Sequence, residues 1–152
     1  MPRQKITTYL WFDNKAEEAA NFYVSLFKDS KINSVVTGPG GVTMIVEFTL
    51  VGIEYIALNG GPHYKFTEAI SLFVDCADQA EIDDLWEKLS AGGSKSRCGW
   101  LKDKFGVSWQ IVPTILMELL RDKDPQRSAR VMKAMMKMNK IVIADLKKAS
   151  QE

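Results

Sequence analysis

The chain has 152 residues, of which 46% are hydrophobic and 26% are charged, and its formal net charge is +1. This composition is typical of a soluble globular protein, and the length fits one domain over residues 1–152 with a sizeable core. A nearly neutral chain gives no reason to expect a nucleic-acid partner. No apolar run approaches the roughly 20 residues of a membrane-spanning helix.

The first part of the sequence predicts one strand, one helix and then three strands. Residues 6–12 are β-branched and aromatic, which favours a strand. Asn14 followed by Glu17 has the spacing of a helix-capping box, and apolar residues then recur at helical intervals to about Lys28. Glycine-containing turns divide the next stretch into three predicted strands over 32–37, 42–50 and 53–58.

The same order of elements occurs a second time. A strand is predicted over 69–74, and Asp78 with Glu81 repeats the capping signal before a helix that ends at Gly92. Two short strands over 94–98 and 99–102 and a longer one over 107–112 complete the series. The front halves match at an offset of about 62 to 64 residues and the back halves at 54, which indicates an internal duplication.

Two βαβββ modules, residues 4–61 and 69–113, therefore predict an α+β fold. Side by side they would give a curved, mostly antiparallel eight-stranded sheet with outer helices and a cleft within. Residues 114–152 are predicted to form a helical extension. It begins with a short helix over 114–121, and Asp124 and Pro125 then start one amphipathic helix that runs through Leu146. The regular spacing of its basic residues is typical of a solvated face.

The stretch from Trp100 to Pro113 carries the most chemical information. Val107, Trp109 and Ile111 alternate with a more polar face, Ser108, Gln110 and Val112, so the strand is expected to line a cavity. Asp103 begins a turn that ends in Gly106, and it is expected to accept backbone hydrogen bonds rather than to act as an acid.

We single out five candidate ligand-binding residues: Thr8, Glu54, Trp100, Phe105 and Gln110. Thr8 and Gln110 are assigned to the cleft face, and their neighbours Tyr9, Trp11 and Trp109 to the core. Glu54 shares a face with Ile56, the counterpart of Gln110 in the repeat; a solvent-facing strand end is the alternative. Trp100 and Phe105 suit a flat or apolar small molecule.

The sequence resembles the vicinal oxygen chelate superfamily of glyoxalases, bleomycin-resistance proteins and extradiol dioxygenases. The resemblance is to its PhnB-like branch, often labelled as demethylubiquinone 3-methyltransferases. It covers nearly the whole chain and is carried by the segments LWFDNKAEEAANFYVSLF, LNGGP, SLFVDCADQAEIDDLWEKLSAGG, CGWLKDKFGVSWQIVP and RVMKAMMKMNKIVIADLKKA.

The resemblance implies metal-ligand positions near Thr8, at Ile56 or Leu58, at 69–71 and at Gln110. None of these carries a histidine or carboxylate, so we expect no bound metal. The only histidine, His63, is predicted to lie in a connector. Neither glycine-rich segment, 38–41 or 60–61, leads from a strand into a helix, so we expect no cofactor site of the usual methyltransferase type.

The two cysteines bear on the compartment of the protein, and the superfamily resemblance bears on its oligomeric state. Cys76 and Cys98 match neither a metal spacing nor a disulfide framework, which favours a reduced, cytoplasmic setting; a long-range bridge between them stays open. We expect a homodimer, as is common in the superfamily, that binds an unidentified small molecule in its cleft. The alternative is an isomerase, lyase or transferase that uses polar cleft residues such as Glu54 and Gln110.

Overall fold

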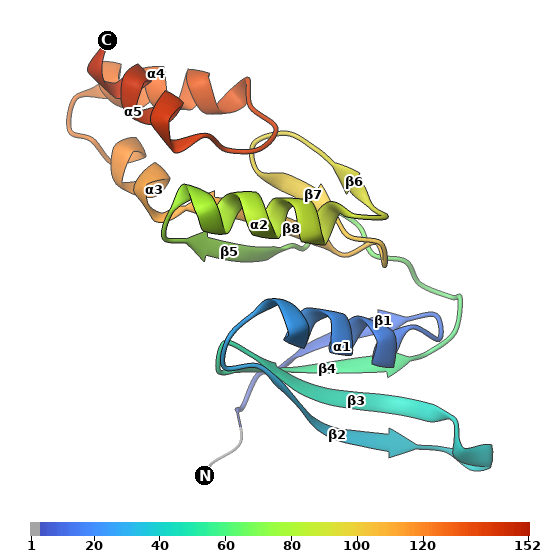
Figure 1. Ribbon diagram of the computed structural model, residues 1–152. Coiled ribbons are helices and arrows are strands. Elements are labelled where there is room, and N and C mark those ends of the chain that lie inside the picture. The colour runs from blue at the N-terminus through green and yellow to red at the C-terminus, as the bar shows by residue number, and fades with distance from the viewer. Residues whose placement is uncertain (1–3) are drawn as a thin grey trace. The chain divides into compact units, whose positions relative to one another are not determined.

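The computed structural model describes residues 4–152 and divides the chain into two compact units, with the boundary between Phe66 and Thr67. Each unit contains a strand, a helix and three further strands in that order (Figure 1). The α+β class and the tandem βαβββ organisation are therefore confirmed. The eight strands form two mixed sheets of four, one in each unit, and neither sheet is closed.

The first unit has the strand order β1-β4-β3-β2, in which β1 runs parallel to β4 and the other pairs are antiparallel. Its elements are β1 (Thr8–Phe12), α1 (Ala16–Leu26), β2 (Lys31–Thr37), a 3₁₀ turn η1 (Pro39–Gly41), β3 (Thr43–Leu50) and β4 (Ile53–Asn59). Alternation along β3 buries Val46, Phe48 and Leu50, and α1 packs against the sheet with its buried residues Ala20 and Tyr23.

The start of α1 differs from the sequence-based prediction. Asn14 is not its N-cap: Asn14 has a left-handed backbone with φ 59°, and α1 begins after Lys15 without a cap from a neighbouring side chain. Asn59, at the end of β4, supplies the cap instead. Its Oδ1 accepts a hydrogen bond of 2.8 Å from Ala16 N–H, and its Nδ2 donates one of 3.0 Å to the carbonyl of Thr43. One amide side chain thus joins α1, β3 and β4.

The second unit repeats this arrangement with the strand order β5-β8-β7-β6, and β5 runs parallel to β8. Its elements are β5 (Leu72–Cys76), α2 (Gln79–Ser90), β6 (Ser94–Lys95), β7 (Trp100–Lys102) and β8 (Ser108–Pro113). The cap predicted at Asp78 is confirmed, because its Oδ1 accepts Glu81 N–H at 2.9 Å. Glu81 in turn accepts Ala77 N–H at 2.8 Å.

The C-terminal residues form three helices, α3 (Thr114–Leu120), α4 (Pro125–Met136) and α5 (Ile143–Gln151). The cap by Asp124 is confirmed, since its Oδ1 accepts Gln126 N–H at 2.9 Å. The prediction of one continuous helix through Leu146 is wrong. A helix of that length would extend roughly 30 Å and spread its apolar stripe along one line.

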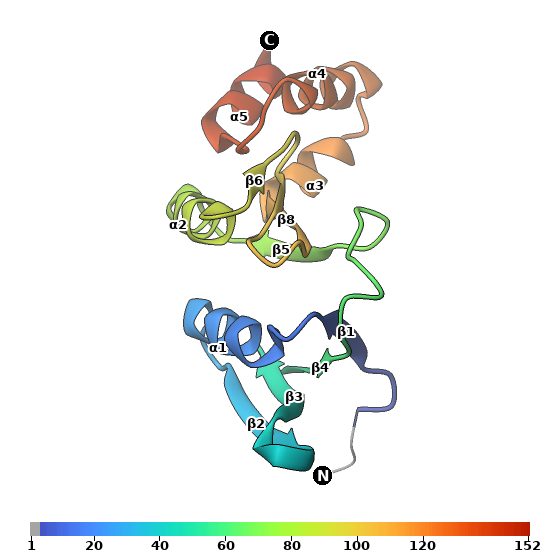
Figure 2. The same ribbon diagram turned by 90° about the vertical axis from the view of Figure 1, so that its right-hand side faces the viewer.

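A turn after Met136 instead brings α4 and α5 side by side (Figures 1 and 2). This arrangement buries a compact cluster made of Val112, Leu116, Val131, Ile141 and Leu146. In residues 4–152, no helix is long and apolar enough to cross a membrane.

The shared role of Asn59 gives a stability prediction. Asn59→Ala removes the cap of α1 and leaves the Ala16 N–H without its partner, so we expect the free energy of unfolding to fall by about 1–2 kcal/mol. Asn14→Gly keeps the left-handed backbone and removes only the side chain that the sequence suggested as the cap. It is expected to change stability by less than about 0.5 kcal/mol. Urea denaturation of both variants provides the comparison, and equal losses would contradict the cap by Asn59.

Candidate functional site

The turn between β7 and β8 is built around the carboxylate of Asp103, which is 2% exposed. Its Oδ1 accepts the N–H groups of Phe105 and Val107 at 2.9 and 3.0 Å. Its Oδ2 accepts the indole N–H of Trp109 at 2.9 Å. The predicted role of Asp103 as a turn residue is confirmed. The turn fixes the register in which β7 and β8 present their side chains.

That register creates two faces on the sheet of the second unit. One is apolar: Trp109, Ile111 and Leu101 are buried, and α2 packs on β7 and β8 with its buried residues Leu85 and Trp86. The other we call the Gln110 face, and it carries Phe73, Trp100, Lys102, Ser108 and Gln110.

Gln110 lies in the middle of a cross-strand row on this face. It is directly opposite Phe73 on β5 and Trp100 on β7. Its Nε2 donates a hydrogen bond of 2.9 Å to the hydroxyl of Ser71, just before β5. The row therefore combines two aromatic rings with a neutral pair of polar side chains, which is a surface suited to an organic molecule.

A cavity of about 570 Å³ adjoins this face at the β6–β7 edge, within the range of roughly 300–1,000 Å³ that ligand pockets occupy. The residues that line it are Glu68, Ser94, Lys95, Ser96, Arg97, Cys98, Trp100, Leu101, Lys102, Ser108 and Met136. Ser108 is 1% exposed, and its Oγ is the single buried side-chain polar atom in the described part of the chain without a hydrogen-bond partner. An unpaired buried hydroxyl is unfavourable, so its presence in a cavity wall calls for an explanation.

Among the five predicted ligand-binding residues, the structure brings Trp100 and Gln110 together as cross-strand neighbours. Trp100 also lines the cavity. Phe105 is half-buried in the turn, with the Lys104 ammonium 5.3 Å from its ring centroid, and it is not among the residues that line the cavity. Thr8 and Glu54 belong to the first unit.

Thr8 and Glu54 lie on opposite faces of the first sheet. Thr8 pairs with Tyr55, and Glu54 is the next residue along β4, so its side chain points to the other side. Thr8 shares its face with the buried residues Leu10 and Phe12. The prediction that Thr8 lies on the face opposite the core side of β1 is therefore wrong.

The aromatic residues of β1 that were predicted to lie in the core are therefore on the opposite, less buried face. Tyr9 is 52% exposed. Trp11 is half-buried; its ring makes an edge contact with Tyr64 at 4.9 Å, and its indole donates to the Gly61 carbonyl. The segment is apolar on both faces, so alternation alone did not distinguish the two. Trp109 is buried as predicted.

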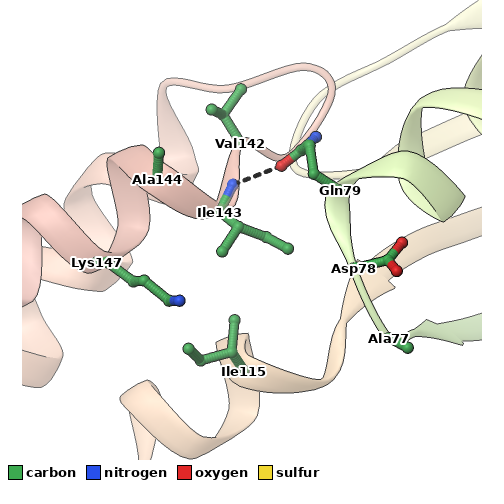
Figure 3. A pocket seen from close by; sticks show the side chains of 8 residues that line it. All are labelled: Ala77, Asp78, Gln79, Ile115, Val142, Ile143, Ala144 and Lys147. Carbon is green, nitrogen blue, oxygen red and sulfur yellow. Dashed lines mark hydrogen bonds between the residues drawn. The ribbon is translucent and has the colours of Figure 1, made fainter.

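A second cavity, of about 490 Å³, lies where α5 meets α2 and α3. Figure 3 shows Ile115, Ile143 and Lys147 around it. The amide of Gln79 accepts Ile143 N–H at 2.8 Å and donates to the carbonyl of Ile141 at 3.0 Å. Gln79 therefore ties the C-terminal helices to the second module. Sequence reasoning missed it, because a glutamine in the first turn of a helix carries no signal for a partner 62 to 64 residues away.

The side chains that commonly bind metals are dispersed. In residues 4–152 there is no group of three or more His, Cys, Asp or Glu residues that could hold a metal ion. His63 lies exposed in the connector. Both cysteines are free thiols, so the bridge left open by the sequence is absent. Burial, reinforced by the charges of Glu81 and Asp75, raises the pKa of Cys76 to about 12. Cys76 is therefore a protonated thiol in the core.

Residues 4–112 match the model of a protein family described as 3-demethylubiquinone-9 3-methyltransferase. The chain belongs to this family. It is the PhnB-like branch of the vicinal oxygen chelate fold. A PhnB protein from Bacillus cereus is 39% identical to this family member. The match covers 73% of the present chain and 100% of the Bacillus chain, with a TM-score of 0.69.

Two more distant structures share the fold. A protein from Pseudomonas aeruginosa is 18% identical, covers 73% of this chain and 98% of its own, and has a TM-score of 0.61. The fosfomycin resistance protein FosX from Listeria monocytogenes is 13% identical, covers 78% of this chain and 98% of its own, and has a TM-score of 0.54. A comparison with curated proteins found no match to this family member.

The network of Asp103 gives a prediction about the hairpin that carries Trp100 and Gln110. Asp103→Asn turns one acceptor into a donor that faces the indole N–H of Trp109, so we expect a loss of about 2–3 kcal/mol in stability. Asp84→Asn, at an exposed ion pair with Lys88, is the control and is expected to cost about 0.5 kcal/mol or less. Urea denaturation measures both. The cost of Asp103→Asn should shrink in a Trp109→Phe background; an unchanged cost would contradict the network.

Proposed function

We propose that this PhnB-like protein binds a small organic molecule at the Gln110 face of its second module, and that it does so without a metal. The observation that carries the proposal is the row of Phe73, Gln110 and Trp100 beside a cavity of about 570 Å³. Aromatic side chains around a few fixed polar groups are the usual composition of a small-molecule site.

The polar groups of this site are held in place before any ligand arrives. The amide of Gln110 is oriented by its hydrogen bond to Ser71, and the strand that carries it is anchored by Asp103. A binding site loses less entropy on association when its side chains are already fixed. This rigidity supports a binding role at the Gln110 face.

The metal-free part of the proposal rests on the residues at the positions that the superfamily resemblance implies for metal ligands. A FosX structure with Mn(II) shares the fold with a TM-score of 0.52. In this chain the implied positions near Thr8, at Ile56 or Leu58, at 69–71 and at Gln110 carry no histidine or carboxylate. Thr8 in addition shares its face with the buried Leu10 and Phe12, and the amide of Gln110 is paired with the Ser71 hydroxyl. Neutral amides and hydroxyls without a carboxylate or imidazole are a poor donor set for a divalent metal.

The methyltransferase description of the family would require a site for a methyl-donor cofactor, and the glycine-rich segments are the places to look for one. Residues 39–41 form a 3₁₀ turn that leads into β3, and Gly60 and Gly61 follow β4 and lead into a connector. Neither segment passes from a strand into a helix, which is the arrangement that places a nucleotide-like cofactor on a helix N-terminus. We therefore propose binding rather than methyl transfer of that type.

We also propose that the protein forms a homodimer. The first sheet carries exposed apolar side chains on one face, among them Tyr9 and Val36, which are 52% and 45% exposed. A dimer that covers such residues would remove apolar surface from water. Sedimentation analysis of the purified chain distinguishes the dimer from a monomer.

The binding site is tested by screening a library of metabolites against isotope-labelled protein with amide NMR. We expect at least one compound to shift the signals of Trp100 and Gln110, and we expect Gln110→Leu to weaken that binding while the protein stays folded. Mass spectrometry of material extracted from the purified protein identifies a natural ligand. If the compounds that bind shift only residues around Ile115 and Lys147, at the second cavity, the proposal is wrong.

The metal-free state is tested on the same sample. We expect elemental analysis of protein grown with added Mn, Ni, Zn and Fe to find none of them in stoichiometric amount. We further expect EDTA to leave the melting temperature unchanged, because a metal that binds the native state would stabilise it. A stoichiometric metal whose removal lowers the melting temperature would overturn this part of the proposal and leave the ligand site standing.

A further inference from the structure

We propose that the cavity at the β6–β7 edge receives an oxyanion, either a carboxylate or a phosphoryl group, attached to an apolar or aromatic body. The inference rests on the proposed function, because it names the chemical class of the molecule bound beside the Gln110 face.

The charge of the cavity wall is the first observation. Lys95, Arg97 and Lys102 contribute three positive charges, and Glu68 contributes one negative charge. The chain as a whole is nearly neutral, with a formal charge of +1, so this wall concentrates positive charge locally. Such a concentration attracts anions and raises their local concentration.

Within residues 4–152, the ion-pair partners of the two lysines are exposed side chains. Lys95 Nζ lies 3.1 Å from Glu87 Oε1, with side chains that are 47% and 66% exposed. Lys102 pairs with Glu68, with side chains that are 40% and 63% exposed. Exposed ion pairs of this kind contribute little to stability, so both ammonium groups are free to turn toward a ligand at small cost.

Ser108 is the second and independent observation. Its buried Oγ has no hydrogen-bond partner within the described residues, and Ser108 is one of the residues that line the same cavity. Ser108 lies directly opposite Lys102 across the β7–β8 ladder. A hydroxyl donor beside an ammonium group matches a carboxylate or phosphoryl oxygen, which only accepts hydrogen bonds. A bound oxyanion would supply the partner that Ser108 lacks.

Glu68 shows that a carboxylate already fits this end of the cavity. Its side chain reaches Lys102 from the connector before β5, and the hydrogen bond from Lys102 holds the pKa of Glu68 below its usual value. Because Glu68 is itself an exposed residue of the connector, an incoming oxyanion can displace its carboxylate from Lys102. Glu68 is thus an internal competitor for the ligand, and its removal should strengthen binding.

The rest of the wall indicates what the oxyanion is attached to. Trp100, Leu101 and Met136 add apolar surface to the cavity. Met136 belongs to the C-terminal extension, which lies beyond the residues that match the family model. The extension also fixes the loop beside Arg97, because Cys98 N–H and Gly99 N–H each donate at 2.8 Å to the carbonyls of Met138 and Asn139. The extension therefore helps to shape the site.

The test uses benzoate and phenylphosphonate as probes and benzamide as their neutral counterpart, titrated into the full chain with Trp100 signals as the readout. We expect both anions to bind more tightly than benzamide. We expect Arg97→Gln and Lys102→Gln each to weaken anion binding by about tenfold or more, and Glu68→Gln to strengthen it. Lys148→Gln removes the same charge from an exposed position that does not line the cavity, and it should have no effect.

Ser108→Ala provides the sharpest variant. It removes an unpaired hydroxyl, so the melting temperature should stay the same or rise while the affinity for both anions falls. Loss of affinity caused by misfolding would instead lower the melting temperature. If benzamide binds as tightly as benzoate and the charge variants match Lys148→Gln, the oxyanion inference fails. The proposed function then still stands, provided that library compounds shift Trp100 and Gln110; it fails separately if they do not.

Discussion

In each unit the first strand pairs in parallel with the last. This pairing determines where the helix lies and which face of the sheet stays uncovered by it. The helix that follows the first strand covers one face of the sheet, because the chain must cross the sheet before the remaining strands can form. The second face is then left for other uses. In the second unit, the register of β5 with β8 places Phe73 beside Gln110, and the register of β7 with β8 places Trp100 on its other side.

The two faces of β8 show how a single strand separates stability from binding. Trp109 and Ile111 belong to the buried core, while Gln110 and Ser108 lie on the face with the cavity at its edge. Asp103 serves both faces, because its carboxylate holds the hairpin and also satisfies the Trp109 indole inside the core. A change in this turn would therefore alter the register of β7 and β8, and with it the positions of Trp100 and Gln110.

The C-terminal extension is attached to the second module by groups that are far apart in the sequence. Gln79 binds the backbone on both sides of Val142, and Lys140 pairs with Asp83 at 2.9 Å. Ile141 also approaches Gly99, where a Cβ atom would lie 2.8 Å from the carbonyl oxygen of Ile111. Only glycine fits there, since its φ of 83° is also unfavourable for other residues.

The helix caps illustrate how far the sequence could be used for prediction. Asp78 with Glu81 was predicted correctly because both partners are close in sequence and the cap is a local hydrogen bond. Asn14 was predicted by the same rule and was wrong, since Asn59 reaches Ala16 from a strand 43 residues away. The long C-terminal helix failed for a related reason: burial of Ile141 and Leu146 against Val112 favours a turn that no local signal marks.

The sequence by itself determined the order of elements in the two modules, the duplication, the Asp103 turn and the absence of metal-type donors from the expected positions. These follow from local hydrogen bonds, periodicity and residue chemistry, which act over a few residues. Only the tertiary structure decided which face of β1 is buried, where α1 is capped and where the C-terminal helices turn. It also brought Ser108, Lys102 and Glu68 together in one cavity. Those outcomes depend on strand register and on contacts between distant segments, and a one-residue change of register reverses every side chain of a strand.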